Sequence, residues 1–418
     1  MNTFTCIHIV PAMSPQINDA GDYALNLAFH LHQSHGIQSR FIVCDPDWEG
    51  PSRVEGFAVK RLRLRSEASI WGLLAASKEK DCAVLLHYAG YAYEKSGAPF
   101  WLYRGIKSWI EEQNGRPSGN QPQFCTVFHE LWRSGSKPWK TEFYLRKLHK
   151  SLVKGLHTLS KFSVASTRRM HQMLEDFEPH KTLWLPIPSN MPVTERSNFT
   201  SQRNGRLRVV ILGSPDARAG AVKAHANLLT TLEAKGKLDC AMLLGTANHA
   251  TGAMTEDVCR LRECISGGRI EVFGQLKPAE VSRHLSEADL FLSPYSGEIA
   301  CSSGSFMAAL AGRCPAVLRD GNNTAPLLEN EHFVASDDSH GSVRRFEQII
   351  KDGRLSQIAT AGRLWYERYA DWNVVARKYG EAICHPGLFD GECLICRERP
   401  NLWETHLQTA GAGTHQTV

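Results

Sequence analysis

The chain has 418 residues, of which 42% are hydrophobic and 22% charged, and its formal net charge is +5. These proportions are typical of globular proteins and exclude a collagenous, coiled-coil or wholly disordered chain, and the length predicts two or three domains. So small a net charge gives no reason to expect a nucleic-acid partner. No apolar run reaches the roughly 18 to 20 residues that a membrane-spanning helix needs. Because the first ten residues have no basic segment and only a short apolar run, we expect a cytoplasmic protein.

Short apolar runs alternate with amphipathic stretches through the first half of the chain. The buried-strand run Thr5–Val10 leads through a proline-containing loop into a helix with one apolar face. Further strands are expected at Phe41–Cys44, Cys82–Leu86, Phe124–Phe128 and Phe162–Ala165. Strands that alternate with helices pair in parallel through crossover connections. Residues 1–188 are therefore predicted to form an α/β domain.

The pattern stops and then restarts. Residues 189–205 are rich in polar residues, follow two prolines and include a third, and are predicted to be a linker. A second α/β domain is predicted over 206–353. Its helices are expected at Ala221–Ala234, at Pro278–Glu287 and from near Ser303. Its strands are expected at Leu207–Leu212, Ala241–Leu244, Ile270–Phe273, Asp289–Leu292 and Pro315–Leu318.

The last helical region, residues 354–383, carries a series of aromatic side chains. Their spacing predicts one face of a single helix, and we interpret that face as a packing surface. The members of this series are Trp365, Tyr369, Trp372 and Tyr379.

Residues 384–418 are predicted to be a polar tail. It begins with four soft metal ligands, Cys384, His385, Cys393 and Cys396, whose spacing matches no standard zinc module. A loosely ordered tail is favoured, and whether these residues bind a metal stays open.

Ligands of open parallel sheets bind beyond the carboxyl ends of the strands, where helix N-termini present free amides. The first such loop ends in Gly21 and Asp22, and a glycine at a helix start lets a ligand approach the backbone. An ordinary surface loop capped by Asp19 or Asp22 is the alternative. No Gly-x-Gly-x-x-Gly pattern is present, so a dinucleotide fingerprint is missing.

The first loop of the second domain carries a strand-end glycine followed by cations, which suits a phosphate group. The residues concerned are Gly213, Ser214, Arg218 and Lys223. An ordinary turn with surface cations explains the pattern equally well.

The loop at 293–315 is the most informative of the three. It runs through Glu298 and three serines into an Ala-rich helix, so unpaired amides and hydroxyls could meet a diphosphate. The small residues at the helix start are Ser302, Ser303, Gly304 and Ser305. A plain capped helix needs neither Glu298 nor three serines, so a ligand site is favoured.

This loop, Ser293-Pro-Tyr through Glu298 to Gly304-Ser-Phe-Met-Ala-Ala-Leu-Ala-Gly-Arg-Cys-Pro-Ala-Val, resembles the nucleotide-sugar loop of the retaining GT-B glycosyltransferases of group 1 (family 4-like). Gly21-Asp-Tyr-Ala resembles the glycine loop of that family, and Thr126-Val-Phe-His-Glu resembles its strand-end histidine beside the donor sugar. The stretch from His87 to Trp101 resembles a bacterial subset. The resemblance covers about residues 5–383.

The resemblance implies a GT-B fold, in which two Rossmann-like domains face each other across a cleft and the C-terminal helix packs back on the first domain. It also implies a nucleotide-diphosphate sugar as the donor and a saccharide, lipid or other small molecule as the acceptor. Retention of configuration, a role in polysaccharide biosynthesis and no required cofactor or metal are implied as well. On this basis the catalytic residues are His129 and Glu298, and the acceptor-side residues are Tyr88, Tyr91 and Glu130. The donor-binding residues are Gly21, Asp22, Gly213, Ser214, Arg218, Lys223, Ser302, Ser303, Gly304 and Ser305.

The sequence departs from the family pattern in two places. The second glutamate of the family's Glu-x7-Glu motif is replaced by Ala308, and Ser214 and Ala219 stand where an Arg and Lys pair is usual. Arg218 and Lys223 are the candidate substitutes for that pair. A weak or inactive nucleotide-sugar-binding protein therefore stays open, as does a sugar-nucleotide epimerase, for which only Glu130 and Glu298 offer carboxylates.

Two further segments each allow more than one interpretation. Asp45-Pro-Asp47 has the Asp-x-Asp form that metal-dependent glycosyltransferases of another architecture use, but the second α/β series argues against that architecture. The basic, apolar stretch Leu145–Phe162 suits either a peripheral contact with an anionic membrane or a solvated helix face, and the latter is favoured. The sequence does not indicate the sugar, the nucleotide, the acceptor or the oligomeric state.

Overall fold

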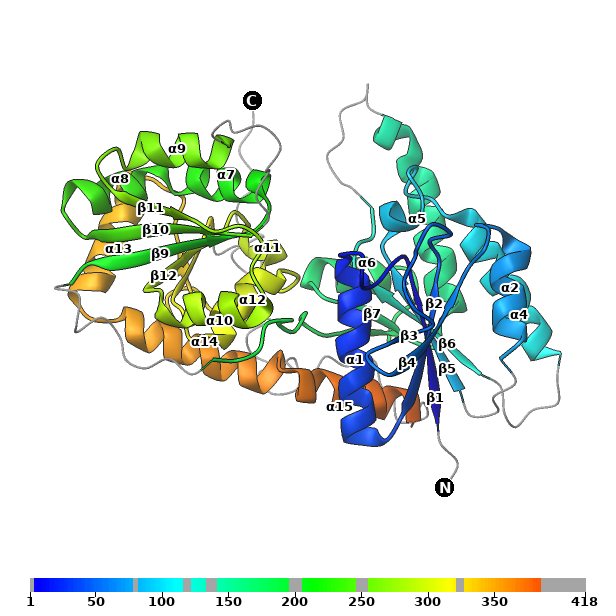
Figure 1. The fold of residues 1–418 in the computed structure, drawn as a ribbon. Coiled ribbons are helices and arrows are strands. Elements are labelled where there is room, and N and C mark those ends of the chain that lie inside the picture. The colour runs from blue at the N-terminus through cyan, green and yellow to red at the C-terminus, as the bar shows by residue number, and fades with distance from the viewer. Residues whose placement is uncertain are drawn as a thin grey trace, which may run out of the picture. The chain divides into compact units, whose positions relative to one another are not determined.

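The computed structural model describes residues 4–77, 82–115, 122–132, 141–194, 205–245, 255–320 and 327–384. The chain forms two compact units, each with its own sheet (Figure 1). The first unit takes in the chain up to Leu185 together with the stretch that begins at Trp372, and the second unit runs from Pro186 to Asp371. The predicted fold class, two α/β domains with parallel sheets, is confirmed.

The first unit has an eight-stranded sheet in the order β3-β4-β2-β1-β5-β6-β7-β8. Its pairs are parallel except for the hairpin of β3 and β4. The strands are β1 (Thr5–Val10), β2 (Gln38–Val43), β3 (Arg53–Val54), β4 (Phe57–Arg61), β5 (Cys82–Tyr88), β6 (Gln123–Phe128), β7 (Ser163–Ala165) and β8 (Thr182–Trp184). Since β2 and β5 lie on opposite sides of β1, the order reverses there, and the loops after β1 and β5 flank the place where such sheets bind ligands.

Helices cover both faces of this sheet (Figure 1). They are α1 (Asp19–His35), α2 (Glu67–Ala75), α3 (Gly90–Tyr93), α4 (Phe100–Asn114), α5 (Thr141–Leu159), α6 (Arg168–Glu175) and α15 (Trp372–Cys384). α1 and α15 pack together on one face, while α2, α4 and α5 bury Ile70, Ile106 and Leu152 against the other face. Asn18 caps α1 by accepting from the Gly21 amide, and Gly36 ends the helix at a positive φ of 65°.

The second unit has a six-stranded sheet in the order β11-β10-β9-β12-β13-β14, with parallel pairing throughout the described strands. The strands are β9 (Leu207–Leu212), β10 (Leu238–Leu244), β11 (Arg269–Val272), β12 (Leu290–Leu292), β13 (Ala316–Leu318) and β14 (Val334–Ala335). The helices are α7 (Pro215–Ala224), α8 (Ala226–Ala234), α9 (Glu256–Cys264), α10 (Pro278–Glu287), α11 (Gly297–Ala300), α12 (Gly304–Ala311), α13 (His340–Lys351) and α14 (Leu355–Tyr369). The order reverses between β9 and β12, which places the loops after these two strands at the corresponding switch point.

The predicted single helices are broken at two points. The helix expected over Ala221–Ala234 is interrupted at His225, which ends α7 and precedes α8. The last helical region is interrupted after Tyr369, and α14 belongs to the second unit whereas α15 belongs to the first. The expectation of one continuous aromatic face was therefore wrong.

The aromatic residues of that region nevertheless pack as expected, because all of them are buried. Trp372 of α15 stacks on His30 with ring centroids 5.6 Å apart, and the hydroxyls of Tyr379 and Tyr23 are 3.1 Å apart. α15 is thus an integral layer of the first unit.

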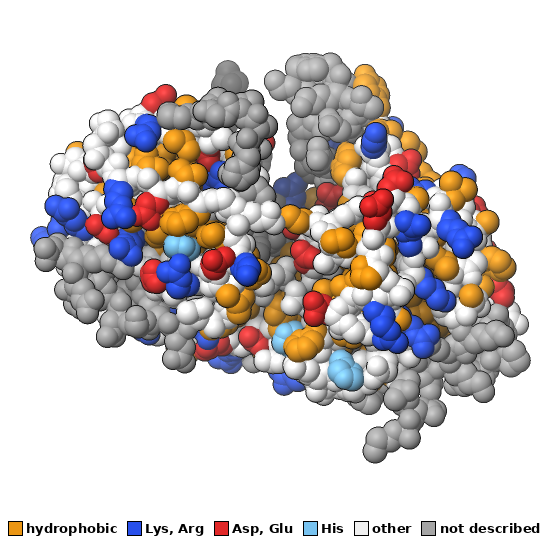
Figure 2. Space-filling view, in the orientation of Figure 1, with side chains coloured by type: hydrophobic (Ala, Val, Ile, Leu, Met, Phe, Trp, Pro, Cys, Tyr) orange, Lys and Arg blue, Asp and Glu red, His pale blue; other side chains and the backbone are white. Residues whose placement is uncertain are grey.

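On the face of the molecule shown in Figure 2, lysine and arginine side chains are interspersed with aspartate and glutamate. This mixture agrees with the small net charge of +5. Within the part of the chain that the structure describes, no helix is long and apolar enough to cross a bilayer.

Candidate functional site

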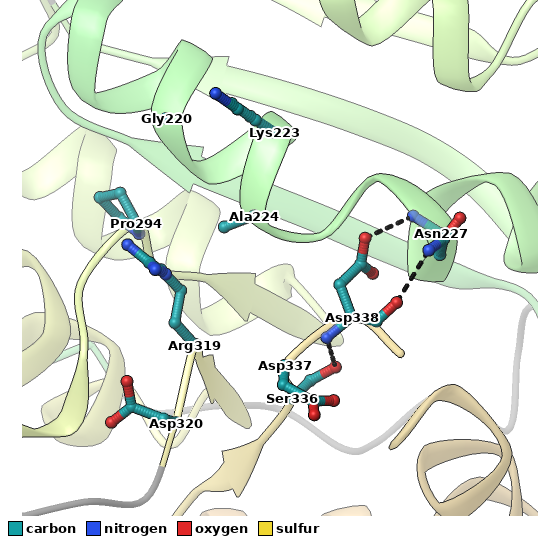
Figure 3. Close-up of a pocket in the computed structure, with 10 residues that line it drawn as sticks. All are labelled: Gly220, Lys223, Ala224, Asn227, Pro294, Arg319, Asp320, Ser336, Asp337 and Asp338. Atoms are coloured by element: carbon teal, nitrogen blue, oxygen red, sulfur yellow. Dashed lines mark hydrogen bonds between the residues drawn. The ribbon is translucent and has the colours of Figure 1, made fainter. Parts of the chain in front are cut away.

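A pocket of about 680 Å³ opens at the carboxyl edge of the second unit's sheet (Figure 3). It is lined by the end of α7, the start of α8 and the residues that directly follow β12, β13 and β14. These are Gly220, Lys223, Ala224, Asn227, Pro294, Arg319, Asp320, Ser336, Asp337 and Asp338. The strand ends of a parallel sheet are where this class of fold places its ligands.

The three carboxylates of the pocket are engaged by hydrogen-bond donors. Asp338 accepts from the amides of Asn227 at 2.8 Å and Leu228 at 3.0 Å, and so caps α8 (Figure 3). Asp337 accepts from the Ser339 amide and hydroxyl, and these bonds, together with one from Ser342, lower the pKa of Asp337 to about 2. Asp320 accepts from the amide of Gly297 at 3.2 Å. These acids therefore hold the loops around the pocket in place.

The two cations of the pocket are Lys223 and Arg319. Neither forms a hydrogen bond or ion pair through its side chain with another residue in the described ranges, and both are exposed. Figure 3 shows Arg319 beside Pro294, away from the bonded pair Asp338 and Asn227. The pocket thus offers two cations that none of its acids contacts directly, beside three aspartates that already accept hydrogen bonds from amides and hydroxyls. Arg319 was not among the predicted residues, but it follows directly after the predicted strand Pro315–Leu318, and a charged residue at that point is the signal that could have identified it.

Arg218 lies beneath the strand ends, 1% exposed, and does not line the pocket. Its Nε donates to Asp257 Oδ2 at 2.6 Å, and its Nη1 donates to the carbonyls of Gly213 at 3.0 Å and Leu244 at 3.3 Å. The guanidinium thereby joins the ends of β9 and β10 to α9. Arg218 supports the loop that was expected to hold a phosphate, and Lys223 is the member of the predicted pair that lines the pocket.

The loop after β9 is tightly packed and capped. Ser214 caps α7 by accepting from the Ala217 amide at 3.3 Å. Gly213 has a positive φ of 149°, and its carbonyl lies 2.2 Å from the position that a Cβ on Gly245 would occupy. Glycine is therefore required where these two strand-end loops meet.

The serine-rich start of α12 does not line the pocket of Figure 3. Ser303 caps the Phe306 amide at 3.3 Å and lies 3.1 Å from the hydroxyl of Ser305, while Ser302 donates to the Ile299 carbonyl at 2.8 Å. Gly304 is exposed, with no neighbouring atom within 4 Å of an added Cβ. A side chain at Gly304 would therefore meet open space, while the amides of Ser302 and Ser303 donate to the carbonyls of Ile299 and Ala300. Glu298 is part of α11, but its side chain lies outside what the structure describes.

The ends of β5 and β6 bring together four predicted residues of the first unit, which are Tyr88, Tyr91, His129 and Glu130. Tyr88 lies opposite Phe128, and its carbonyl accepts from the His129 amide at 2.9 Å. Glu130 accepts from the Tyr91 amide at 3.1 Å. Burial, followed by the nearby charge of Glu130, raises the pKa of Tyr88, whose hydroxyl is buried without a hydrogen-bond partner among the described residues.

His129 is half-buried at the end of β6, and its Nε2 is 3.3 Å from Nδ1 of His87. The ring of Tyr23 meets it edge-on, with centroids 5.1 Å apart. Burial lowers the pKa of His129 to about 4. The imidazole is therefore neutral at pH 7, and it can donate or accept a hydrogen bond without carrying a charge.

The opening loop packs against its own helix. A Cβ on Gly21 would lie 2.1 Å from the Ala12 carbonyl oxygen, so this glycine is needed for contact within the chain, and the space beside it is filled. The cap of α1 is Asn18, so the alternative in which Asp19 or Asp22 caps the helix was wrong. Burial and the neighbouring Asp19 raise the pKa of Asp22 to about 6.

Two segments were candidates for metal binding, the turn at residues 45–47 and the group that begins at Cys384. Asp45 forms an ion pair with Arg65 at 3.1 Å and accepts from the Asp47 amide, as in a tight turn. Within the described ranges no group of three His, Cys, Asp or Glu side chains could hold a metal. Cys384 is exposed at the end of α15, and His385, Cys393 and Cys396 lie outside the described residues.

Similarity to known proteins is found in structure and not in sequence. No family model matches the chain, and no curated protein matches it. Among solved structures, sucrose-phosphate synthase from Thermosynechococcus elongatus matches with a TM-score of 0.61 at 13% identity, over 93% of this chain and 100% of that one. Anabaena HepE in complex with UDP matches with a TM-score of 0.62 at 12% identity, over 91% of this chain and 100% of the other. The UDP-GlcNAc 2-epimerase from Neisseria meningitidis, bound to UDP-GlcNAc, matches with a TM-score of 0.54 at 11% identity, over 91% and 100%.

These neighbours are GT-B proteins, and they align with nearly the whole of this chain. The chain therefore has the GT-B fold, as the resemblance of its loops implied.

Proposed function

We propose that this protein is a glycosyltransferase that moves a sugar from a nucleotide-diphosphate donor to a saccharide, lipid or other small acceptor. The GT-B fold supports this, and so do the neighbours that carry it, which include HepE in complex with UDP-glucose, with UDP, and with UDP and glucose. The single observation that carries the proposal is the pocket of the second unit, in which Lys223 and Arg319 have no acidic side chain bound to them among the described residues.

The diphosphate of the donor is the ligand that this pocket suits best. Sugar transfer builds negative charge on the leaving phosphate, and preorganised cations and amides lower the free energy of that transition state. We assign Lys223 and Arg319 to this task, and propose the loop of Gly213 and Ser214 and the start of α12 at Ser302 to Ser305 as further donors. On this assignment the protein's own groups meet the charge, and we propose that transfer needs no metal.

The acceptor-side residues are assigned to the strand ends of the first unit, and of the two catalytic residues His129 belongs to the first unit and Glu298 to the second. His129, neutral and half-buried, is proposed to hydrogen-bond a hydroxyl of the donor sugar, and Glu298 to accept from another. Tyr91 and Glu130, which lie beside His129, are proposed to bind the acceptor, and the fully buried Tyr88 is proposed to support them from beneath. Gly21 and Asp22 are proposed to contribute to donor binding, and retention of configuration belongs to the same proposal.

An epimerase acting on the sugar of the same kind of donor is the second candidate. It is favoured by the two epimerase neighbours, from Neisseria meningitidis and Listeria monocytogenes, with TM-scores of 0.54 and 0.52. The two activities differ in their products. An epimerase converts the donor without releasing nucleoside diphosphate, whereas a transferase releases it in proportion to the glycosylated acceptor.

The test is a transfer assay with a panel of nucleotide sugars and saccharide or lipid acceptors, in which both products are measured. His129→Ala and Glu298→Ala are each expected to reduce transfer by about 100-fold or more, because each removes a hydrogen bond that strengthens in the transition state. His32→Ala and Glu331→Ala, at exposed positions near the amino ends of β2 and β14, serve as matched controls that should retain activity. Full activity in both site variants would remove these residues from the mechanism.

A further inference from the structure

Three histidine rings form a row through the core of the first unit. His8 on β1 approaches His87 on β5, with Nδ1 and Nε2 3.1 Å apart, and His87 Nδ1 lies 3.3 Å from His129 Nε2. At the inner end, His8 Nε2 is 3.3 Å from the hydroxyl of Ser39 on β2. A chain of hydrogen bonds therefore runs from Ser39 to the candidate site at His129.

All three rings are neutral at pH 7. His8 and His87 are fully buried, and burial lowers the pKa of His8 to about 3, the pKa of His87 well below its usual value and that of His129 to about 4. Uncharged aromatic rings lie against all three histidines, since Phe41 stacks on His8 and the ring of Tyr23 lies against both His87 and His129. Each imidazole thus has one nitrogen that donates and one that accepts.

These contacts permit only two arrangements of protons. If Ser39 donates to His8, then His8 and His87 each donate from Nδ1, and His129 accepts at Nε2 and carries its own proton on Nδ1. If Ser39 accepts, all three rings are protonated on Nε2, and Nδ1 of His129 is a bare acceptor. The tautomer of His129 is therefore tied to the proton of a serine on a different strand.

The surroundings of Ser39 decide between the two arrangements. This residue is 6% exposed, and in the described ranges its hydroxyl has no hydrogen-bond partner apart from His8. If it accepted from His8, its own proton would be buried without an acceptor, which is costly. If it donates, each buried polar hydrogen of the row has an acceptor, and the one hydrogen left over, Nδ1–H of His129, is on the half-buried ring at the outer end.

We infer that Ser39, His8 and His87 act as positioning residues that hold His129 in the Nδ1–H tautomer. Nε2 of His129 is occupied by His87, so Nδ1–H is the group left to donate to a ligand. The role of His129 towards a sugar rests on the proposed function. To that function this inference adds that His129 donates to a ligand oxygen and does not accept from a hydroxyl.

The experiment is ¹⁵N NMR of the full chain labelled at histidine, in which protonated and unprotonated ring nitrogens have widely separated shifts. His8, His87 and His129 are identified by the loss of signals in single His→Asn variants. Three other histidines provide internal references, because His149, His157 and His225 each lie within hydrogen-bond distance of a backbone carbonyl through Nε2 and must be protonated there. The row is expected to show the opposite pattern, with protons on Nδ1. An Nε2–H pattern or a doubly protonated ring at any of the three positions at pH 7 would overturn the inference.

A serine substitution tests the coupling itself. Ser39→Ala removes the donor that fixes the row, so the Nε2–H form that imidazole prefers in water is expected to gain population at His129. Ser163→Ala is the matched control, because Ser163 is likewise buried and contacts Nδ1 of His157, outside the row. The Ser163→Ala variant should change the ring-nitrogen shifts of His157 and leave those of His8, His87 and His129 as they are. An unchanged His129 spectrum in Ser39→Ala would contradict the coupling. No donor sugar is needed for these spectra, so a lack of transfer activity would count against the proposed function and not against the row.

Discussion

At the scale of single residues, the buried pair of Arg218 and Asp257 links α9 to the ends of β9 and β10. Arg218 and Lys223 follow the same strand-end glycine and were interpreted together as phosphate ligands. The structure separates them, because Arg218 is enclosed with Asp257 and two carbonyls while Lys223 lines the pocket. Asp257 lies 39 residues further along the chain, and only the packing of α9 against α7 brings it close. Nothing local to Arg218 indicates this partner.

The buried pair gives a prediction about stability. Asp257→Ala leaves the guanidinium of Arg218 buried without its counter-ion, so the free energy of unfolding of the second unit should fall by about 3 to 5 kcal/mol. The double variant Arg218→Met/Asp257→Leu removes both charges and should recover most of that loss. Urea unfolding of the two variants measures the difference, and equal stability of Asp257→Ala and the wild type would show that the pair does not support the strand ends.

At the scale of elements, the glycine at the start of α1 is required by packing. A methyl group at Gly21 would overlap the Ala12 backbone, whereas Gly72 in α2 has no atom within 4 Å of an added Cβ. Gly21→Ala should therefore destabilise the first unit by about 1 to 3 kcal/mol. Gly72→Ala should stabilise the protein by about 0.5 to 1 kcal/mol, because it replaces glycine inside a helix. Thermal or urea unfolding compares the two, and a neutral Gly21→Ala would contradict the close packing.

The long buried strands were predictable because their apolar runs need no knowledge of neighbours. β1 and β9 have the predicted bounds, and β5, β6 and β10 differ by one to three residues at one end. The strands that were missed are short or lie at a sheet edge, among them β8, β14 and the β3–β4 hairpin, where few residues carry the pattern. The break at His225 was missed because the groups that meet this residue are distant in the sequence, among them the carbonyl of Ser293, 68 residues away, to which its imidazole donates.

At the scale of the whole molecule, the two α/β units follow from the repeated alternation of strands and helices. The sequence also indicated which loops follow the strands, and of the residues predicted there Lys223 lines the pocket and His129 lies at the end of β6. Arg319 and the acids after β14 were not predicted as a group with Lys223, because β13 and β14 are only three and two residues long and their order in the sheet is a tertiary property. The pocket is assembled from four separate segments that sequence reasoning treats one at a time.

The central claim is that the pocket of the second unit binds a nucleoside diphosphate through Lys223 and Arg319. Isothermal titration calorimetry with UDP, GDP and ADP, on the full chain, tests it most directly. Lys351→Ala, on the exposed face of α13, is the matched control. At least one diphosphate is expected to bind the wild type and the control, and each of Lys223→Ala and Arg319→Ala should weaken it by about 10-fold or more, since a hydrogen bond to a charged group contributes about 1.5 to 3 kcal/mol. Wild-type affinity in the double variant, or no binding of any of the three diphosphates, would contradict this assignment.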